Sequence, residues 1–430
     1  MIMVSIDDHV VEPPDMFERH MPERYKEEAP RVVQVDGVDH WFFQGDHLEA
    51  PDVDCLAVHN GKQQHRCFPS TVASWPKQEW SVDAMTFSEM RPGCYDIHAR
   101  IADMNAGGVL AAMAFPSFAG FAGTHLARGS HDQKLTAITV AAYNDWHVDE
   151  WCAEYPGRFI PLVIGPLFDR DALIAEIHRV AAKGVTAISM PETPQAMGLP
   201  SYYTDHWDPV LKALCDTDMT MCLHIGQAHN LVKVGPEVPH MHQTFMASSL
   251  SLMVATDLYM SGVLKRFPAL KIAISEGGIG WIPFFLDKID RFVTNQEWAE
   301  LNAQLPPGTP TEIFRRQFLA CFIHDPSSLK LADRIGVDSI AWESDYPHSD
   351  SNWPSGPDEL HEQATFAGLS DEVLNKITYE NACRFMRWEP FAVIPKEEAK
   401  VGALRAKAAS VDTSRVSRQE FKRRFALAEA

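Results

Sequence analysis

Acidic and imidazole side chains follow four of the apolar runs in this sequence, at the point where each run ends. Asp7 and His9 close the first run in SIDDH, and His224 closes a later one in MCLHIG. Glu276 closes AISEGG, and Asp345 follows the last run in AWESDYPH. If these runs are parallel strands of one barrel, their carboxyl ends meet at one face, where barrel enzymes build their active sites. Two aspartates and two histidines can bind one divalent cation. The predicted metal ligands are therefore Asp7, His9, His224 and Asp345.

The spacing of the first pair supports this prediction. In an extended strand, residues two apart share a face, so Asp7 and His9 can both point inward while Asp8 points away. Each residue alone also has an ordinary interpretation. A histidine at a strand end is often a hydrogen-bonded core residue, and Asp345 could begin the turn before Pro347. Metal binding is favoured because all four residues fall at strand ends on the same predicted side.

Eight short, almost continuous apolar runs alternate with longer helical patterns. Such runs are typical of parallel strands covered on both faces. The expected strands cover residues 2–6, 108–115, 159–164, 185–189, 219–223, 271–275, 318–323 and 339–342. The expected helices cover residues 96–105, 134–154, 171–182, 207–217, 244–266, 280–300, 327–335 and 358–366. This alternation predicts an α/β fold, a (β/α)8 TIM barrel within residues 1–390.

Two segments lie outside the alternation. Residues 18–93 form an insertion after the first strand, which we expect to cover the mouth of the barrel and to contain a hairpin. Its aromatic residues either pack on the scaffold or cover a substrate. Residues 391–430 form a basic helical tail with nine Lys and Arg against five Asp and Glu. The tail is expected to dock on the barrel or on an acidic neighbouring subunit.

Composition excludes several classes of protein. With 46% hydrophobic and 22% charged residues the chain can bury a large core, which excludes a disordered chain or a rod. A net charge of −20 disfavours nucleic-acid binding. The start of the chain lacks the basic region of a signal peptide, and no apolar run is long enough to span a membrane. The eight cysteines form no CxxC pair, so we expect reduced thiols and a cytoplasmic protein.

Several longer motifs carry a family resemblance. The segments SIDDHVVEPPDMF, LHIG, SEGGIGWIPFFLDKIDR, ESDYPHSDSNWP and ITYENACRFM occur in that order across residues 2–388. Together they resemble the amidohydrolase-related family, in the branch of the aminocarboxymuconate-semialdehyde and hydroxybenzoate decarboxylases. The resemblance implies a metal-bearing barrel of the metal-dependent hydrolase type. Asp7 and His9 then correspond to the first-strand ligand pair, His224 to the fifth-strand ligand and Asp345 to the eighth-strand aspartate.

The sequence departs from the family pattern at two positions. Asp7 replaces the first histidine of the ligand pair, which adds negative charge and shifts the preference toward harder cations. One divalent ion is expected, with zinc first and manganese or iron as alternatives. Glu276 stands where many members have a histidine that shuttles protons. His348 either holds Asp345 in place or caps a loop.

The resemblance implies non-oxidative decarboxylation of a small aromatic or unsaturated carboxylic acid, with Asp345 or Glu276 returning a proton to carbon. The first alternative is a metal-dependent hydrolase of an amide, lactone or related bond. In that case Asp345 is the base and Glu276 or His348 the proton relay. The second alternative is a metal-free binding or assembly module. Family members and the basic tail together suggest a homodimer or higher homo-oligomer whose other partner is a small organic acid.

Overall fold

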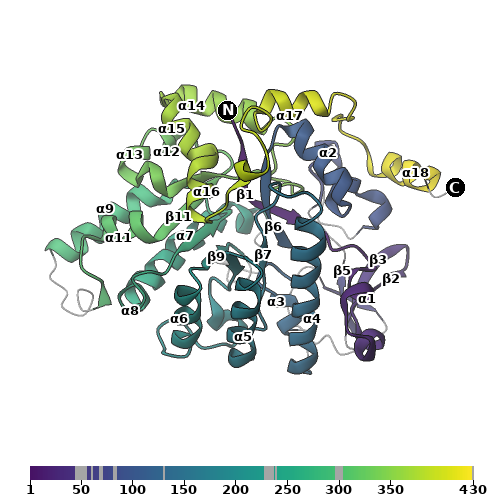
Figure 1. Ribbon diagram of the computed structural model, residues 1–430, viewed down its shortest axis with the longest axis horizontal. Coiled ribbons are helices and arrows are strands. Elements are labelled where there is room, and N and C mark those ends of the chain that lie inside the picture. Colours follow the sequence, from purple (N-terminus) through teal and green to yellow (C-terminus); the bar gives the residue numbers. More distant parts are fainter. Residues whose placement is uncertain are drawn as a thin grey trace.

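Eight parallel strands alternate with helices along the chain, in a computed structural model (Figure 1). It describes residues 1–43, 56–59, 62–66, 71–80, 85–128, 131–226, 237, 240–295 and 304–428. The strands are β1 (Val4–Val10), β6 (Ala111–Pro116), β7 (Leu162–Val163), β8 (Ala187–Ser189), β9 (Thr220–His224), β10 (Ile272–Ser275), β11 (Phe318–Phe322) and β12 (Ile340–Trp342). Each of them lies in or overlaps one of the runs expected from the sequence, and all of their residues are buried.

Backbone hydrogen bonds close these strands into a barrel. Strand β1 pairs with β6, and strands β7 to β12 pair in chain order, all in parallel. Ile160 N donates to Ala112 O over 3.0 Å, which joins the β6 and β7 segments. Asp345 N donates to Asp7 O over 2.8 Å, which joins the end of β12 to β1. The predicted TIM barrel is therefore confirmed.

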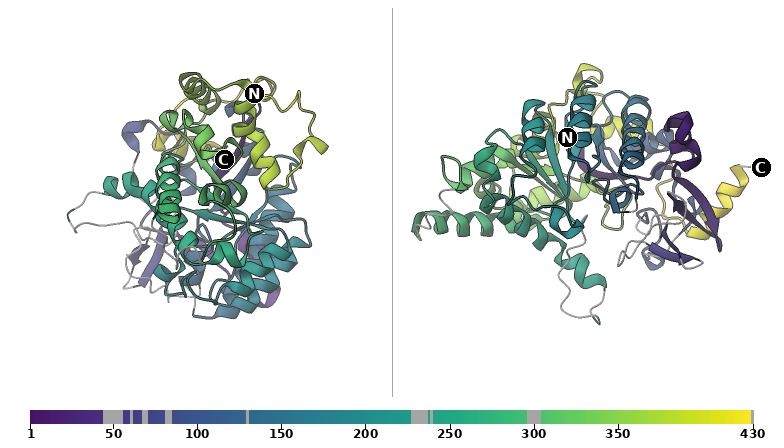
Figure 2. Two further views of the ribbon diagram at one scale, coloured as in Figure 1. Left: turned by 90° about the vertical axis from the view of Figure 1, so that its left-hand side faces the viewer. Right: turned by 90° about the horizontal axis from the view of Figure 1, so that it is seen from below.

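Helices cover the outside of the barrel (Figures 1 and 2). They include α2 (Ile97–Gly107), α4 (Gln133–Trp146), α5 (Arg170–Ala181), α6 (Asp208–Asp216), α7 (His240–Met260), α9 (Trp281–Asn295), α11 (Pro310–Gln317), α14 (Gly356–Ala367) and α16 (Asn381–Phe385). Aspartates cap the start of three of them: Asp96 accepts the amide of Ala99, Asp132 those of Lys134 and Leu135, and Asp169 that of Ala172.

Three expected helices are wrong in detail. The one expected at 327–335 is two short helices, α12 (Pro326–Leu329) and α13 (Ala332–Ile335). The one expected at 244–266 is interrupted at Gly262, whose φ of 76° ends α7 before α8 (Val263–Arg266). The one expected at 134–154 continues past α4 as the π-helix η5 (His147–Cys152).

The segment after β1 contains a small antiparallel sheet. Following α1 (Met16–His20), strands β2 (Arg31–Val35), β3 (Val38–Phe42), β4 (Leu56–His59) and β5 (Lys62–Arg66) pair in the order β2-β3-β5-β4. Asp36 and Gly37, both with positive φ, make the two-residue turn of the β2–β3 hairpin. The segment contacts the loop after β12, because Ala73 N donates to Pro347 O over 3.0 Å.

The basic tail lies against its own chain. Helix α17 (Val401–Lys407) packs on α2, and Arg405 forms an ion pair of 2.6 Å with Asp358. Helix α18 (Arg418–Ala428) contacts the 3-10 helix η3 (Phe87–Glu89). Figures 1 and 2 place α18 at the end of the molecule that carries the β2–β5 sheet. Arg415 donates to the carbonyl oxygens of Ala73 and Trp75 over 3.1 and 2.9 Å. The described part of the tail therefore contacts its own chain, which is one of the two places where it was expected to dock.

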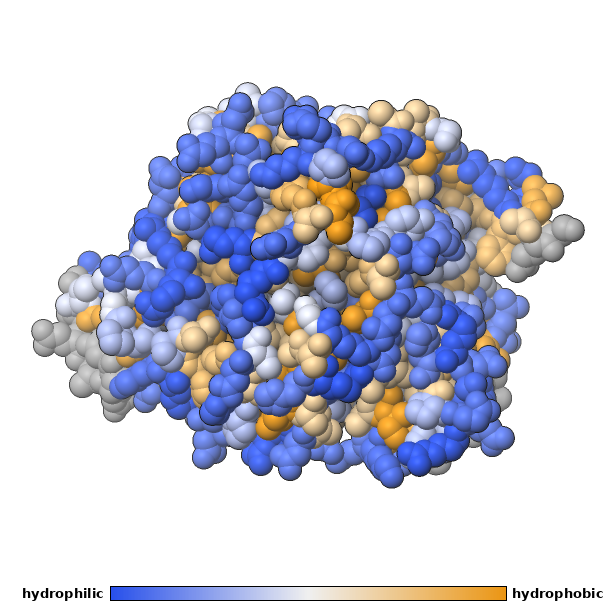
Figure 3. Space-filling model, in the orientation of Figure 1, coloured by the Kyte–Doolittle hydropathy of each residue, from blue (hydrophilic) through white to orange (hydrophobic). Residues whose placement is uncertain are grey.

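The large apolar side chains are mostly buried in and around the barrel. Fully buried examples are Trp75, Trp146, Trp207 and Trp342. The face drawn in Figure 3 is largely hydrophilic, with small and separate hydrophobic areas. None of the described helices is both long and apolar enough to cross a bilayer.

Candidate functional site

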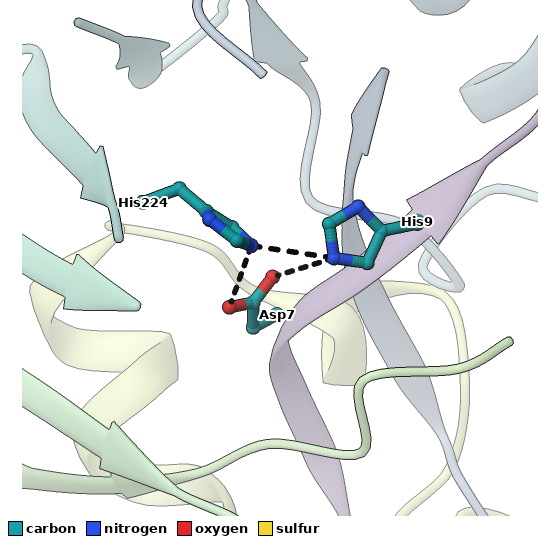
Figure 4. Close-up of side chains that lie close together, drawn as sticks. All are labelled: Asp7, His9 and His224. Atoms are coloured by element: carbon teal, nitrogen blue, oxygen red, sulfur yellow. Dashed lines mark hydrogen bonds and ion pairs between the residues drawn. The ribbon is translucent and has the colours of Figure 1, made fainter. Parts of the chain in front are cut away.

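Strand β1 directs alternate side chains to opposite sides, as its D-x-H spacing predicts. Asp7 and His9 point toward His224 of β9 (Figure 4). Asp8 lies on the other side of the strand. There Asp8 accepts a hydrogen bond of 2.7 Å from Ser5 Oγ and lies 3.6 Å from the guanidinium of Arg100. The strand runs on to Val10, so Asp7 and His9 lie within β1 instead of closing it.

Arg100 of α2 braces this strand from outside the barrel. Its side chain is fully buried and donates to the backbone oxygens of His9 and, over 2.6 Å, of Gly93. The guanidinium also lies over the ring of Tyr346, 4.6 Å from its centre, and Tyr346 directly follows Asp345. Arg100 therefore fixes the backbone beside two of the predicted ligands. Sequence reasoning missed it, because nothing local distinguishes this arginine from one on a solvent-exposed helix face.

The four predicted ligands converge at the carboxyl ends of the strands. The Nε2 atoms of His9 and His224 lie 3.3 Å apart. Asp7 Oδ1 is 3.6 Å from His9 Nε2, and Asp7 Oδ2 is 3.5 Å from His224 Nε2 (Figure 4). Asp345 Oδ1 lies 3.1 Å from His9 Nε2. All four side chains are fully buried, although they come from segments near the start, the middle and the last quarter of the sequence.

This donor set suits a divalent cation. Atoms placed about 2.1 Å from one ion at tetrahedral angles lie about 3.4 Å from one another. The separations given above run from 3.1 to 3.6 Å. One ligand atom each of Asp7, His9 and His224 lies within 4.8 Å of the others, and Asp345 joins this set through His9. Both carboxylate oxygens of Asp7 are buried without a hydrogen-bond partner among the described residues, whereas Asp345 Oδ1 contacts His9 and His348. Buried carboxylates are normally paired or bound to metal, so the chemistry of these oxygens suits a bound cation.

Burial and neighbouring charges set the protonation of the cluster. Burial, followed by the charges of Glu343, Asp345 and Glu276, raises the pKa of Asp7 well above its usual range. Burial and the nearby His348 lower the pKa of His9 to about 3, and burial with His9 lowers the pKa of His224 well below its usual range. Burial opposes ionisation of Asp345, but His348 and His9 overcome it and hold its pKa low. Neutral imidazoles and an ionised carboxylate are the forms that bind metals.

Glu276 stands at the rim of this cluster. It follows β10 in a left-handed conformation with φ of 58°, and its carboxylate Oε2 lies 3.3 Å from His224 Nε2. Its side chain is 32% exposed, so it can meet both solvent and a bound molecule. The next residue must be glycine because a Cβ on Gly277 would lie 1.9 Å from Ser251 Oγ of α7. Burial and the carboxylates of Asp345 and Glu343 raise the pKa of Glu276 well above its usual range.

Glu343 and Cys321 are further members of the cluster that sequence reasoning missed. Both are buried, and with Asp7 they bring three ligand-type atoms within 4.8 Å of one another. The Cys321 thiol donates to Glu343 Oε2, which also accepts the backbone amide of Glu276 over 3.1 Å. Glu343 therefore fixes the turn that carries Glu276. Its position two residues before Asp345 in AWESDYPH was the available signal.

His348 and two phenylalanines complete the surroundings. His348 Nδ1 lies 3.0 Å from Asp345 Oδ1, and its ring stacks on that of His9 with centres 3.7 Å apart. Of the two interpretations of His348, holding Asp345 in place is the one that matches the geometry. The Phe121 ring lies 4.0 Å from His224 and 4.8 Å from His9, and Phe115 lies 4.8 Å from His224. The candidate ligands therefore have the rings of Phe115 and Phe121 on one side, and His348 beside His9 and Asp345.

Known proteins share this architecture. A curated relative, 2-amino-3-carboxymuconate-6-semialdehyde decarboxylase of Dictyostelium discoideum, is 23% identical over 327 residues, which cover 73% of this chain and 83% of that protein. An amidohydrolase structure from Mycobacterium avium subsp. paratuberculosis matches with a TM-score of 0.66 and 20% identity, over 90% of this chain and 99% of the other. A 5-carboxyvanillate decarboxylase from Novosphingobium aromaticivorans matches with a TM-score of 0.57 and 17% identity, over 90% and 96%. That structure contains manganese and 4-hydroxy-3-methoxy-5-nitrobenzoic acid.

The family assignment rests on a family model that matches most of the chain. Residues 47–388 match the model of a family described as amidohydrolase. The match includes β9, β10 and β12, which carry or directly precede His224, Glu276 and Asp345, whereas β1 lies before it. The barrel described above is the fold that the sequence resemblance implies, and the predicted family is confirmed. The chain belongs to the amidohydrolase family.

Proposed function

We propose that this protein is a metal-dependent, non-oxidative decarboxylase of a small aromatic or unsaturated carboxylic acid. The observation that carries the proposal is the buried cluster of Asp7, His9, His224 and Asp345 with the half-exposed Glu276 at its rim. Such an arrangement offers a cation site beside a group that can deliver a proton. Two of the similar proteins named above are decarboxylases of unsaturated or aromatic acids, which supports the choice of reaction.

Asp7, His9, His224 and Asp345 would hold the cation. When bound, a divalent ion there supplies a Lewis acid that holds the substrate's carboxylate and an adjacent oxygen. Zinc suits a set of two imidazoles and two carboxylates, whereas the second carboxylate moves the preference toward manganese. Iron is the third candidate. Metal analysis of the purified protein, and the activity that each ion restores after chelation, decides among them.

A residue of the chain would then donate a proton to the substrate carbon. Decarboxylation breaks the bond between the carboxyl carbon and the neighbouring carbon, and the electron pair stays on the latter while carbon dioxide leaves. Glu276 at the rim is the better placed residue to protonate that carbon, because Asp345 already contacts both His9 and His348. Asp345 is the alternative donor. His348 would orient Asp345, and the Phe121 side of the cluster would exclude water from the reacting carbon.

Product analysis tests the proposal. The metal-supplemented enzyme is incubated with a panel of ortho-hydroxybenzoates, and released carbon dioxide and the decarboxylated phenol are measured. Stoichiometric release of both supports the decarboxylase. Entry of oxygen-18 from water into a product of an amide or lactone panel, without carbon dioxide, would identify a hydrolase instead. A protein that takes up no metal would favour the binding or assembly module.

We also propose a division of the chain, its assembly state and its location. Residues 1–390 would form the barrel domain, with 18–93 as an insertion over its mouth and 391–430 as the helical tail. The contact of Ala73 with Pro347 supports a place for the insertion near the site. A homodimer or higher homo-oligomer is proposed, and a sedimentation mass equal to one chain would contradict it. The six described cysteines are free, which suits the proposed cytoplasmic location.

A further inference from the structure

A buried carboxylate connects the exits of two neighbouring barrel strands. Glu12 follows β1, and its side chain is fully buried. Its Oε2 accepts the backbone amide of Phe118 over 2.8 Å, and its Oε1 accepts that of Ala119 over 3.1 Å. Phe118 and Ala119 belong to the turn of residues 117–123 that follows β6. Two amides of one turn are therefore held by a single side chain from the adjacent strand.

The carboxylate occupies a place that is unfavourable without these two bonds. Burial raises the pKa of Glu12 to about 7, although the amides of Phe118 and Ala119 act to lower it. A buried carboxyl group costs stability unless its oxygens are paired. Because both oxygens are paired with the same turn, the bonds of Glu12 serve to hold that turn.

The turn carries an aromatic ring onto the candidate metal ligands. Three residues after Phe118, the half-buried Phe121 places its ring 4.0 Å from that of His224 and 4.8 Å from that of His9. The same ring lies 6.3 Å from His348, whose side chain is partly exposed at the mouth. The partly buried ring of Phe121 thus lies beside the candidate ligands.

On the other side, the turn is fixed by the inserted segment. Phe118 stacks on Trp41 of β3, with ring centres 4.4 Å apart and planes inclined by 20°, and meets Phe17 edge-on at 5.7 Å. Glu12 and Trp41 therefore hold Phe118 from its backbone and from its ring. Any change at Glu12 is expected to shift Phe121, because only Gly120 separates Phe121 from the anchored amide of Ala119.

We propose that Glu12 is a positioning residue, whose bonds to the Phe118 and Ala119 amides hold Phe121 as a wall against which the flat face of a conjugated acid packs. This inference rests on the proposed function for the class of substrate. The ring of Phe121 would favour planar conjugated acids over saturated acids of the same size, because aromatic faces stack with aromatic rings. Phe121 would contact the substrate, whereas Glu12 would act only through the turn.

The test compares three variants of the metal-loaded enzyme. Glu12→Gln keeps the shape of the side chain but loses one acceptor, since the amide nitrogen of glutamine cannot accept a hydrogen bond. Phe121→Leu keeps an apolar side chain and removes the flat ring. Glu176→Gln is the matched control, because Glu176 is also a buried carboxylate, bonded to Asn144 and Arg179 on the helical layer. Metal content, amide exchange over residues 116–123 and the Kd for 2-hydroxybenzoate are measured for each.

The anchor predicts a specific pattern. Glu12→Gln should speed amide exchange in the 117–123 turn by at least about tenfold and weaken 2-hydroxybenzoate binding by about threefold to tenfold, with metal content unchanged. Phe121→Leu should weaken binding equally while exchange stays slow, which keeps the inference testable if Glu12→Gln does not fold. On any substrate that is turned over, both changes should raise KM more than they lower kcat. Glu176→Gln should change none of these values.

Different results would overturn different parts. If amide exchange in the turn were unchanged in Glu12→Gln, Glu12 would not anchor the turn. If the Kd for 2-hydroxybenzoate were unchanged in Phe121→Leu, Phe121 would not contact the substrate. A wild-type enzyme that binds cyclohexanecarboxylate as tightly as 2-hydroxybenzoate would also exclude Phe121 as an aromatic wall. Binding of 2-hydroxybenzoate without release of carbon dioxide from any acid would refute the proposed function and leave this inference standing.

Discussion

Replacing Asp7 or its neighbour Asp8 with asparagine should have opposite effects, and the pair tests the candidate metal centre. Both carboxylates are buried in β1 one residue apart. Asp7 lies with His9 and His224 and has no hydrogen-bond partner among the described residues. Asp8 faces Arg100 and Ser5. The two substitutions make the same chemical change, so they differ only in what the replaced carboxyl group contacts.

The size of each effect follows from these contacts. A metal present at 100 to 1,000 times its Kd stabilises the folded protein by about 2.7 to 4.1 kcal/mol. With an unfolding entropy of about 2.1 cal/mol/K per residue, a chain of 430 residues gains about 1 °C in Tm for each kcal/mol. Metal should therefore raise the Tm of the wild type by about 3 to 5 °C. Asp7→Asn should lose this rise, because a ligand is gone.

Without metal, Asp8→Asn should have a lower Tm than the wild type, whereas Asp7→Asn should not. Asp7→Asn relieves a buried carboxylate that faces Asp345, Glu276 and Glu343, so its Tm should equal or exceed that of the metal-free wild type. Asp8→Asn breaks the pairing with the buried Arg100, which costs about 3 to 5 kcal/mol and lowers the Tm by about 3 to 5 °C. It should nevertheless keep the full metal-induced rise.

Differential scanning fluorimetry of chelated and metal-loaded protein measures all six values. Metal analysis after dialysis gives the occupancy of each variant independently. If Asp7→Asn retained wild-type occupancy and the full rise in Tm, Asp7 would not be a ligand. If Asp8→Asn lost the rise as well, the separation of the two faces of β1 would be wrong.

Three further predictions concern proton transfer and pH. Glu276→Gln should lower kcat by about 10² to 10⁴-fold with metal content unchanged, since it removes only a proton carrier; steady-state kinetics with metal analysis checks this, and near-normal kcat would exclude Glu276. Asp345→Asn should abolish turnover with the barrel still folded by circular dichroism, and retained turnover would exclude Asp345 from the mechanism. The third concerns His147, which is buried and whose ring nitrogens have no partner among the described residues. Burial lowers the pKa of His147 to about 3. Because the unfolded chain binds this proton near pH 6.5, stability is complete above that pH and is lost as the pH falls toward 3, by about 2 kcal/mol at pH 5. In chelated protein, His147→Phe should remove that part of the stability change between pH 7 and 5, and an unchanged pH slope would contradict the assignment.

The barrel and the convergence of its ligands could be predicted because their signals are local. Parallel strands buried on both faces leave uninterrupted apolar runs, so the strands were found within a few residues of their bounds. The direction of Asp7 and His9 followed from the two-residue repeat of a strand. His224 and Asp345 needed only the rule that strands of a barrel end at one face.

The remaining parts of the site depend on contacts between distant residues. Arg100 bonds to His9, and Glu12 to Phe118, across more than 90 residues, and neither pairing has a sequence pattern of its own. Glu276 and Asp345 both adopt positive φ, which is uncommon for residues other than glycine and depends on the surrounding packing. Glu343 was within reach, because a buried strand end followed by E-S-D places two acids two residues apart.

The hydrogen bond from Asp345 to Asp7 joins the first strand of the chain to the last. Of the four proposed ligands, Asp7, His9 and His224 are made early, so a nascent chain on the ribosome would lack Asp345 until about four fifths of it has been made. If all four ligands are needed, loading with metal would follow the pairing of the segment after β12 with β1. Fragments ending before β12 would fail to acquire the ion however much of it was supplied in the growth medium.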